Sequence, residues 1–94
     1  MLRVALCEDE RAELARTAAL LEDYFQARPD QEGQVSLYAG GSALLEGVEA
    51  QGGFDLYLLD ILLPGLDGIQ LGRRLRALGD GGEIIYLTIS SDYA

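Results

Sequence analysis

Three carboxylates stand directly after two apolar runs of the sequence, in a pattern that could bind a cation. Glu8 and Asp9 follow the run Leu2–Cys7. Asp60 closes a second run, and Pro64–Gly65 comes four residues later. Runs of this length predict buried parallel strands, and Pro-Gly predicts a turn. Asp60 is therefore expected at the carboxyl end of a central strand, where open α/β sheets hold their ligands. Two strands that end in carboxylates indicate a cation site and allow for a nucleophile.

The composition limits the classes of function that the chain can have. A length of 94 residues predicts one domain, which buries roughly 60–65% of its unfolded surface. The net charge is −9, and no Lys stands among the seven basic residues. This charge argues against nucleic-acid binding by the chain itself, because phosphate contacts need clustered Lys and Arg. The absence of His removes imidazole as base, phosphocarrier or metal ligand.

The single cysteine and the hydropathy pattern indicate the cellular compartment of the chain. Cys7 has no partner for an internal disulfide, and its place inside an apolar run predicts a buried small hydrophobe. The first residues turn acidic too soon for a signal peptide. No run approaches the ~18 apolar residues of a membrane span. We expect a cytoplasmic protein without membrane contact.

The elements that must position the carboxylates alternate along the chain. Apolar residues recur at helical spacing over Arg11–Ala27, and Ser42 is the predicted N-cap of a second helix that closes at Gly52–Gly53. The other predicted elements are strands over Leu2–Cys7, Val35–Tyr38, Phe54–Leu59 and Glu83–Thr88 and a helix over Gly68–Leu78. Such alternation predicts an α/β fold, a doubly wound parallel sheet with helices on both faces. The flavodoxin-like strand order 2-1-3-4-5 would place strands one and three side by side.

In that order Glu8, Asp9 and Asp60 converge, and Thr88 ends the neighbouring strand. Three features of the chain resemble the response-regulator receiver domains of two-component systems, which have the CheY-like fold. They are the acidic pair Glu8–Asp9, Asp60 with its continuation Leu63–Gly68, and Thr88, which lies 28 residues beyond Asp60. The resemblance covers essentially the whole chain. Three matching features in the right order, each at a strand end, make it specific.

The resemblance implies a phosphoacceptor domain rather than an enzyme, with Asp60 taking a phosphoryl group from a sensor histidine kinase. Because the carboxylate and the phosphoryl group are both anionic, a divalent cation must neutralise them, and oxygen ligands suit Mg²⁺. The resemblance assigns Asp9, Asp60 and the backbone carbonyl of Leu62 as direct ligands, with Glu8 acting partly through water. The Thr88 hydroxyl would hydrogen-bond the phosphoryl group.

The chain also departs from the family pattern. A receiver continues past its fourth strand, so residues 1–94 are expected to be a partial receiver domain without strand 5 and helix 5. The family's Lys at the end of strand 5 is missing too, and Ile89 is bulkier than the residue usual there. An apolar fourth strand would then form an open sheet edge. We expect association with a second copy through that edge, segment exchange, or a longer parent protein.

Two alternatives and two partner predictions accompany this interpretation. A receiver-like interaction module that no longer accepts phosphate fits the missing Lys. A phosphohydrolase with an aspartate nucleophile is disfavoured. Such an enzyme is expected to have a second acid two residues after the nucleophile, and that position holds Leu62. The ending Leu87–Ala94 resembles receivers joined to a LytTR-type DNA-binding domain, which implies a transcriptional regulator as the parent. Exposed residues of the first helix are candidates for kinase docking: Glu10, Ala12, Glu13 and Arg16.

Overall fold

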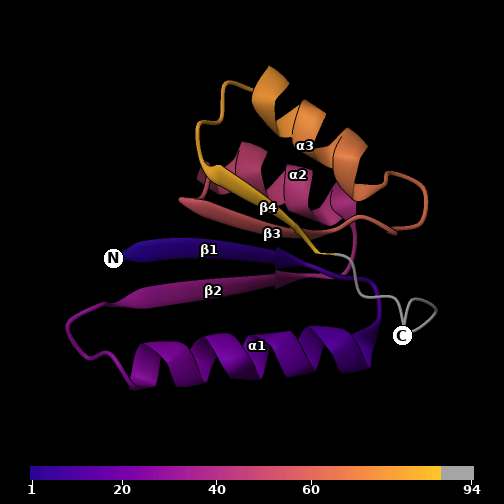
Figure 1. Ribbon diagram of the computed structural model, residues 1–94. Helices are drawn as coiled ribbons and strands as arrows, with labels where there is room; N and C mark the ends of the chain where they lie inside the picture. The colour runs from indigo at the N-terminus through magenta and orange to yellow at the C-terminus, as the bar shows by residue number, and fades with distance from the viewer. Residues whose placement is uncertain (88–94) are drawn as a thin grey trace.

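The computed structural model describes residues 1–87, in which four strands form one sheet and three helices cover it (Figure 1). Thr88 and Ile89 therefore lie outside the described residues. Within the described part, no helix is both long and apolar enough to cross a bilayer. The strands are β1 (Leu2–Cys7), β2 (Gly33–Tyr38), β3 (Leu56–Asp60) and β4 (Glu83–Leu87), and the helices are α1 (Arg11–Gln26), α2 (Gly41–Gln51) and α3 (Gly68–Ala77).

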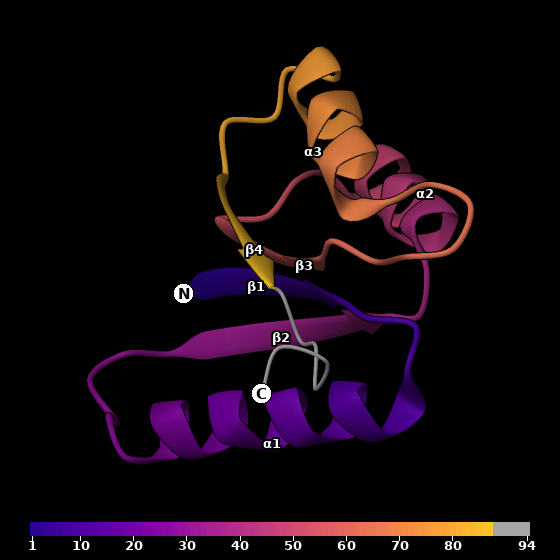
Figure 2. The ribbon, with the colours of Figure 1, turned by 45° about the vertical axis from the view of Figure 1, so that its right-hand side comes forward.

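The sheet is entirely parallel, with the order β2-β1-β3-β4. This order confirms the predicted flavodoxin-like arrangement for the four strands. Helix α1 lies on one face, and α2 and α3 lie together on the other, as both views show (Figure 2). Strands β1 and β3 are neighbours at the centre, with Cys7 paired to Leu59. Their carboxyl ends therefore lie side by side at the same end of the sheet. Helix α1 follows β1 on one face, and α3 follows β3 on the other.

The apolar runs of β1 and β3 are continuous because both faces of these strands are buried. Alternate side chains point to opposite faces, so each strand feeds two cores. The core under α2 and α3 contains Ala5, Cys7, Leu44, Val48, Phe54, Tyr57, Leu59, Leu63, Leu71 and Leu75. The core under α1 contains Val4, Leu6, Ala18 and Leu58.

The boundaries of α1 and α2 each differ from the sequence prediction at one end. Helix α1 ends at Gln26, one residue before the predicted end at Ala27. The prediction of Ser42 as N-cap is wrong, because α2 already begins at Gly41 and the extended residue at the cap is Gly40. No side chain caps this helix. Ser is a favoured cap type, but its position is decided by how soon the chain can turn after the preceding strand.

Strand β3 lies two residues later than predicted at its start and one residue later at its end. It begins at Leu56 and includes Asp60. Phe54 is buried before the strand, where its amide donates a hydrogen bond to the Tyr57 hydroxyl at 3.0 Å. A hydrophobic residue can thus be a core residue without being part of the ladder. The prediction for α3 was one residue too long, since the helix ends at Ala77.

Strand β4 is an edge of the sheet within the described residues. It pairs with β3 on one side, and no other described strand lies beside it. Two of its apolar side chains are exposed, Ile85 by 49% and Tyr86 by 38%. An edge strand of this kind presents unpaired backbone groups to other chains.

Candidate functional site

Three carboxylates meet at the carboxyl ends of β1 and β3. One oxygen each of Glu8, Asp9 and Asp60 lies within 4.8 Å of the others. Glu8 is only 4% exposed and Asp60 only 6%, whereas Asp9 is exposed. The neighbouring strands bring together residues that are some fifty positions apart in the sequence. A group of converging carboxylate oxygens is the donor set that Mg²⁺ and Ca²⁺ take.

Backbone amides hold the two buried carboxylates in place. A Glu8 oxygen accepts a hydrogen bond from the amide of Glu10 at 3.0 Å, and an Asp60 oxygen accepts one from the amide of Leu62 at 3.1 Å. Both bonds connect a carboxylate to the amide two residues later, and for Asp60 this is the geometry of an Asx turn. The amide of Glu8 also donates to the carbonyl of Tyr38 at 3.0 Å. The acids are therefore preorganised by their own loops.

Burial and mutual repulsion change the proton affinity of this cluster. Burial is the main cause that raises the pKa of Glu8 from 4.5 to about 7, with further increases from a hydrogen bond to Asp60 and from the charges of Asp60 and Asp9. The Glu10 amide acts in the opposite direction. Burial, followed by the same three acids, raises the pKa of Cys7 to about 12. The raised pKa disfavours the reactive thiolate form of Cys7, and a divalent cation would relieve the repulsion among the acids.

The loop after Asp60 turns sharply and leads into a capped helix. The predicted turn at Pro64–Gly65 is present, and Gly65 has a φ of +76°, which favours glycine. An Asp67 oxygen accepts a hydrogen bond from the Gln70 amide at 2.8 Å, and the Asp67 amide donates to the Gln70 side chain at 3.2 Å. This capping box fixes the start of α3. Asp67 therefore serves helix initiation.

Two other predicted site residues, Leu62 and Thr88, are less fully described by the structure. Leu62 follows Asp60 in the turn, with its side chain 68% exposed, and ligation by its carbonyl stays a prediction. Thr88 lies outside the described residues. Sequence reasoning missed Gly68, which is buried against the main chain of Asp60. A glycine directly after a helix cap was the available signal, since a side chain is normal at that helical position.

The predicted kinase-docking residues of α1 are exposed with one exception. Glu10, Ala12 and Arg16 are exposed. The Glu13 side chain is only 16% exposed and forms an ion pair with Arg16 at 3.0 Å. The expectation that Glu13 is exposed is therefore wrong. A spacing of three residues puts the two charges on neighbouring positions of one helix, where Arg16 covers the carboxylate.

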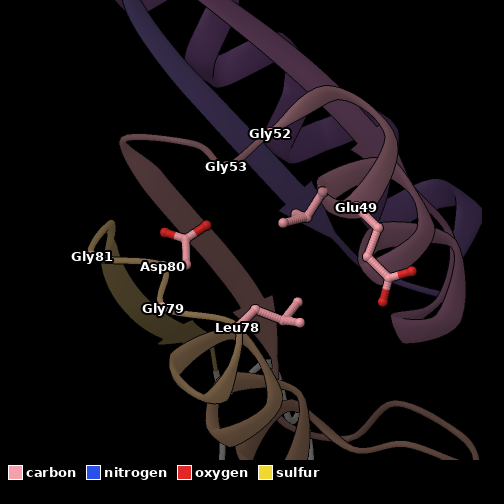
Figure 3. A pocket seen from close by; sticks show the side chains of 8 residues that line it. Glu49, Gly52, Gly53, Leu78, Gly79, Asp80 and Gly81 are labelled. Atoms are coloured by element: carbon pink, nitrogen blue, oxygen red, sulfur yellow. The ribbon is translucent and has the colours of Figure 1, made fainter.

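A separate hollow of about 450 Å³ lies at the opposite end of the sheet (Figure 3). It is formed by the turns before β3 and β4, and the carboxylates of Glu49 and Asp80 lie beside it. Asp80 accepts hydrogen bonds from the Tyr57 hydroxyl and from the Gly82 amide. Burial and then this hydrogen bond raise the pKa of Tyr57. The first bond ties the turn before β4 to strand β3, and the second closes that turn. The hollow includes none of the three clustered acids.

A family model and several known proteins match almost the whole sequence, and some of these proteins are named transcriptional regulatory proteins. The family model described as "Response regulator receiver domain" matches residues 4–94. The uncharacterized transcriptional regulatory protein YkoG of Bacillus subtilis (strain 168) is 36% identical over 86 residues, which cover 90% of this chain and 34% of that protein. The transcriptional regulatory protein PcoR of Escherichia coli is 33% identical over 88 residues, or 94% of this chain and 35% of PcoR. The chain spans about a third of the length of these relatives.

Solved structures show the same fold. The CheY-like response regulator receiver domain protein from Methanospirillum hungatei JF-1 superposes with a TM-score of 0.78 at 26% identity, over 98% of this chain and 69% of that one. The BeF3-activated DrrB receiver domain gives a TM-score of 0.73 at 22% identity, over 99% and 71% of the two chains. The family model covers nearly all of the sequence, and the parallel strand order is that of the CheY-like fold. This chain belongs to the response regulator receiver domain family.

Proposed function

We propose that residues 1–94 act as a receiver domain that accepts a phosphoryl group on Asp60. The observation that carries this proposal is the convergence of Glu8, Asp9 and Asp60 at the carboxyl ends of adjacent central strands. Asp60 is buried and its carboxylate is oriented by an amide of its own loop. A nucleophilic carboxylate beside a carboxylate-rich cation site is the arrangement that phosphoryl transfer to aspartate requires.

In the transfer, a carboxylate oxygen of Asp60 forms a bond to phosphorus while the bond from phosphorus to the donor histidine breaks. Asp9, Asp60 and the Leu62 carbonyl would hold Mg²⁺, with Glu8 acting partly through water, and the ion would supply charge neutralisation at the transferring group. The hydrogen bond from the Leu62 amide to one Asp60 oxygen orients the carboxylate for attack. We assign to the Thr88 hydroxyl a hydrogen bond to the phosphoryl group.

The parent protein is proposed to be a cytoplasmic response regulator whose output is transcription. Relatives that align with almost the whole chain are named transcriptional regulatory proteins. The phosphoryl donor is a sensor histidine kinase, which meets the exposed start of α1 beside the acidic edge. The chain itself has a net charge of −9. DNA binding is therefore assigned to another part of the parent, because an acidic surface repels phosphate.

We also propose that copies of this chain associate through the edge of β4. The strand pairs only with β3 among the described residues, and Ile85 is 49% exposed on it. A second strand added to this edge would satisfy backbone groups and cover apolar surface. Ile85→Lys is expected to shift the mass measured by light scattering from dimer to monomer. A wild-type chain that stays monomeric at high concentration contradicts this association.

Asp60→Asn tests the assignment of the phosphoacceptor. Labelled acetyl phosphate with Mg²⁺ is expected to give an acid-stable, base-labile acyl phosphate on the wild-type chain and none on the variant. Asp30→Asn is the matched control, since Asp30 is exposed in the turn after α1. Label that survives Asp60→Asn refutes the assignment. A wild-type chain that binds Mg²⁺ and takes no label supports an interaction module instead.

A further inference from the structure

The first turn of α3 rests directly on the main chain of Asp60. The amide of Gly68 donates a hydrogen bond to the carbonyl of Ile61 at 3.1 Å. A Cβ atom at position 68 would lie 2.3 Å from the carbonyl oxygen of Asp60 and 2.9 Å from the Cα of Ile61. All of these neighbours are backbone atoms. No flexible side chain could therefore move aside to make room.

Helix α3 cannot easily move away from this contact. Its start is fixed by the capping box between Asp67 and Gln70. Its inner face is anchored in the core by Leu71 and Leu75, which have no exposed surface. Packed interiors transmit a displacement rather than absorb it. The helix thus acts as a rigid stop behind Asp60.

Asp60 is held from its other sides as well. Asp60 pairs with Leu87 in the sheet, and the Ile61 amide donates a hydrogen bond to the Leu87 carbonyl at 3.2 Å. The carboxylate accepts from the Leu62 amide. A methyl group at position 68 would have to displace the Asp60 backbone or the helix by about 1 Å, whereas Mg²⁺ demands near-ideal octahedral geometry. A shift of that size is enough to disturb the ligands.

We infer that Gly68 is a positioning residue, whose missing side chain lets α3 fix the backbone of the phosphoacceptor Asp60. This inference rests on the proposed role of Asp60. Gly68 touches neither the cation nor the phosphoryl group in this scheme; it acts through the carbonyl of Asp60. Its effect should therefore appear in the affinity for Mg²⁺ and in the rate of labelling, beyond any effect on folding.

Gly68→Ala and Gly82→Ala form a matched pair for the test. A Cβ at position 82 would meet the carbonyl oxygen of Phe54 at 2.2 Å, so the clash is of the same kind, but it lies at the amino ends of the strands. Urea unfolding first identifies conditions in which both variants are folded. Gly68→Ala is expected to weaken Mg²⁺ binding, measured by titration calorimetry, by about tenfold or more. Gly82→Ala is expected to keep the wild-type affinity.

A second pair keeps the inference testable if Gly68→Ala does not fold. Asp67→Ala removes the side-chain cap and loosens the first turn of α3 without adding atoms near Asp60. Arg76→Ala removes the bonds to the carbonyls of Asp80 and Gly82 at the other end of the same helix. Asp67→Ala should weaken Mg²⁺ binding several-fold, and Arg76→Ala should not. Wild-type affinity in Gly68→Ala, or equal losses within either pair, overturns the inference.

The failure of this inference can be distinguished from the failure of the proposed function. A wild-type chain that binds Mg²⁺ but takes no label from acetyl phosphate contradicts only the proposed function, because the two pairs are still compared by affinity. A wild-type chain that takes label, with equal labelling rates in Gly68→Ala and Gly82→Ala, contradicts only the inference. A wild-type chain that binds no Mg²⁺ overturns both.

Discussion

Replacement of Glu8 by Gln should change how the stability of the domain depends on pH. Glu8 is 4% exposed, and burial together with neighbouring acids raises its pKa from 4.5 to about 7. Between these two values the folded chain holds a proton that the unfolded chain has released. The free energy of unfolding therefore decreases as the pH rises through this range, by up to about 1.4 kcal/mol per pH unit. Gln cannot ionise, so the variant lacks this part of the slope.

The expected size follows from the shift of the pKa. A difference of about 2.5 units corresponds to at most about 3 kcal/mol. At pH 8, in the absence of divalent cations, Glu8→Gln should be more stable than the wild-type chain by up to this amount. Near pH 4.5 the two should be equally stable, because the Glu8 carboxyl is then protonated in the folded state and only partly ionised in the unfolded state.

Urea unfolding followed by circular dichroism, with EDTA present, measures this difference from pH 4.5 to 8.5. The many other carboxylates of the chain also respond to pH, but they cancel when the two curves are subtracted. Glu46→Gln, at an exposed position of α2, is the matched control and should follow the wild-type curve. Parallel curves for Glu8→Gln and wild type would refute the argument that the folded site raises the pKa of Glu8.

Two further predictions concern the core. Cys7 has no exposed surface, and its pKa is raised to about 12, so a disulfide reagent at pH 8 should modify it only as fast as the chain unfolds; rapid modification under native conditions would contradict this burial. Leu71→Ala should lower the free energy of unfolding by about 2–5 kcal/mol, because its side chain is fully buried. Ile69→Ala, on the 38% exposed neighbour, should cost less, and equal urea midpoints for the two variants would argue against the described packing.

Much of the fold follows from local patterns in the sequence. The run Leu2–Cys7 matches β1 residue for residue, and the Pro64–Gly65 turn is where the dipeptide predicts it. Both succeed because a buried strand and a turn each depend on a few consecutive residues. The prediction of Ser42 as the N-cap of α2 is wrong, since the start of that helix depends on where β2 ends.

Within the site, the sequence alone determined which acids could meet. Alternating strands and helices lead to parallel strands whose carboxyl ends share an edge, so Glu8, Asp9 and Asp60 had to converge in that topology. The tertiary structure alone decided how they meet. The raised pKa of Glu8 and the contact of Gly68 with the Asp60 carbonyl arise from distances of a few ångströms between distant parts of the chain. Burial and close packing set such distances, and no local pattern of residues contains them.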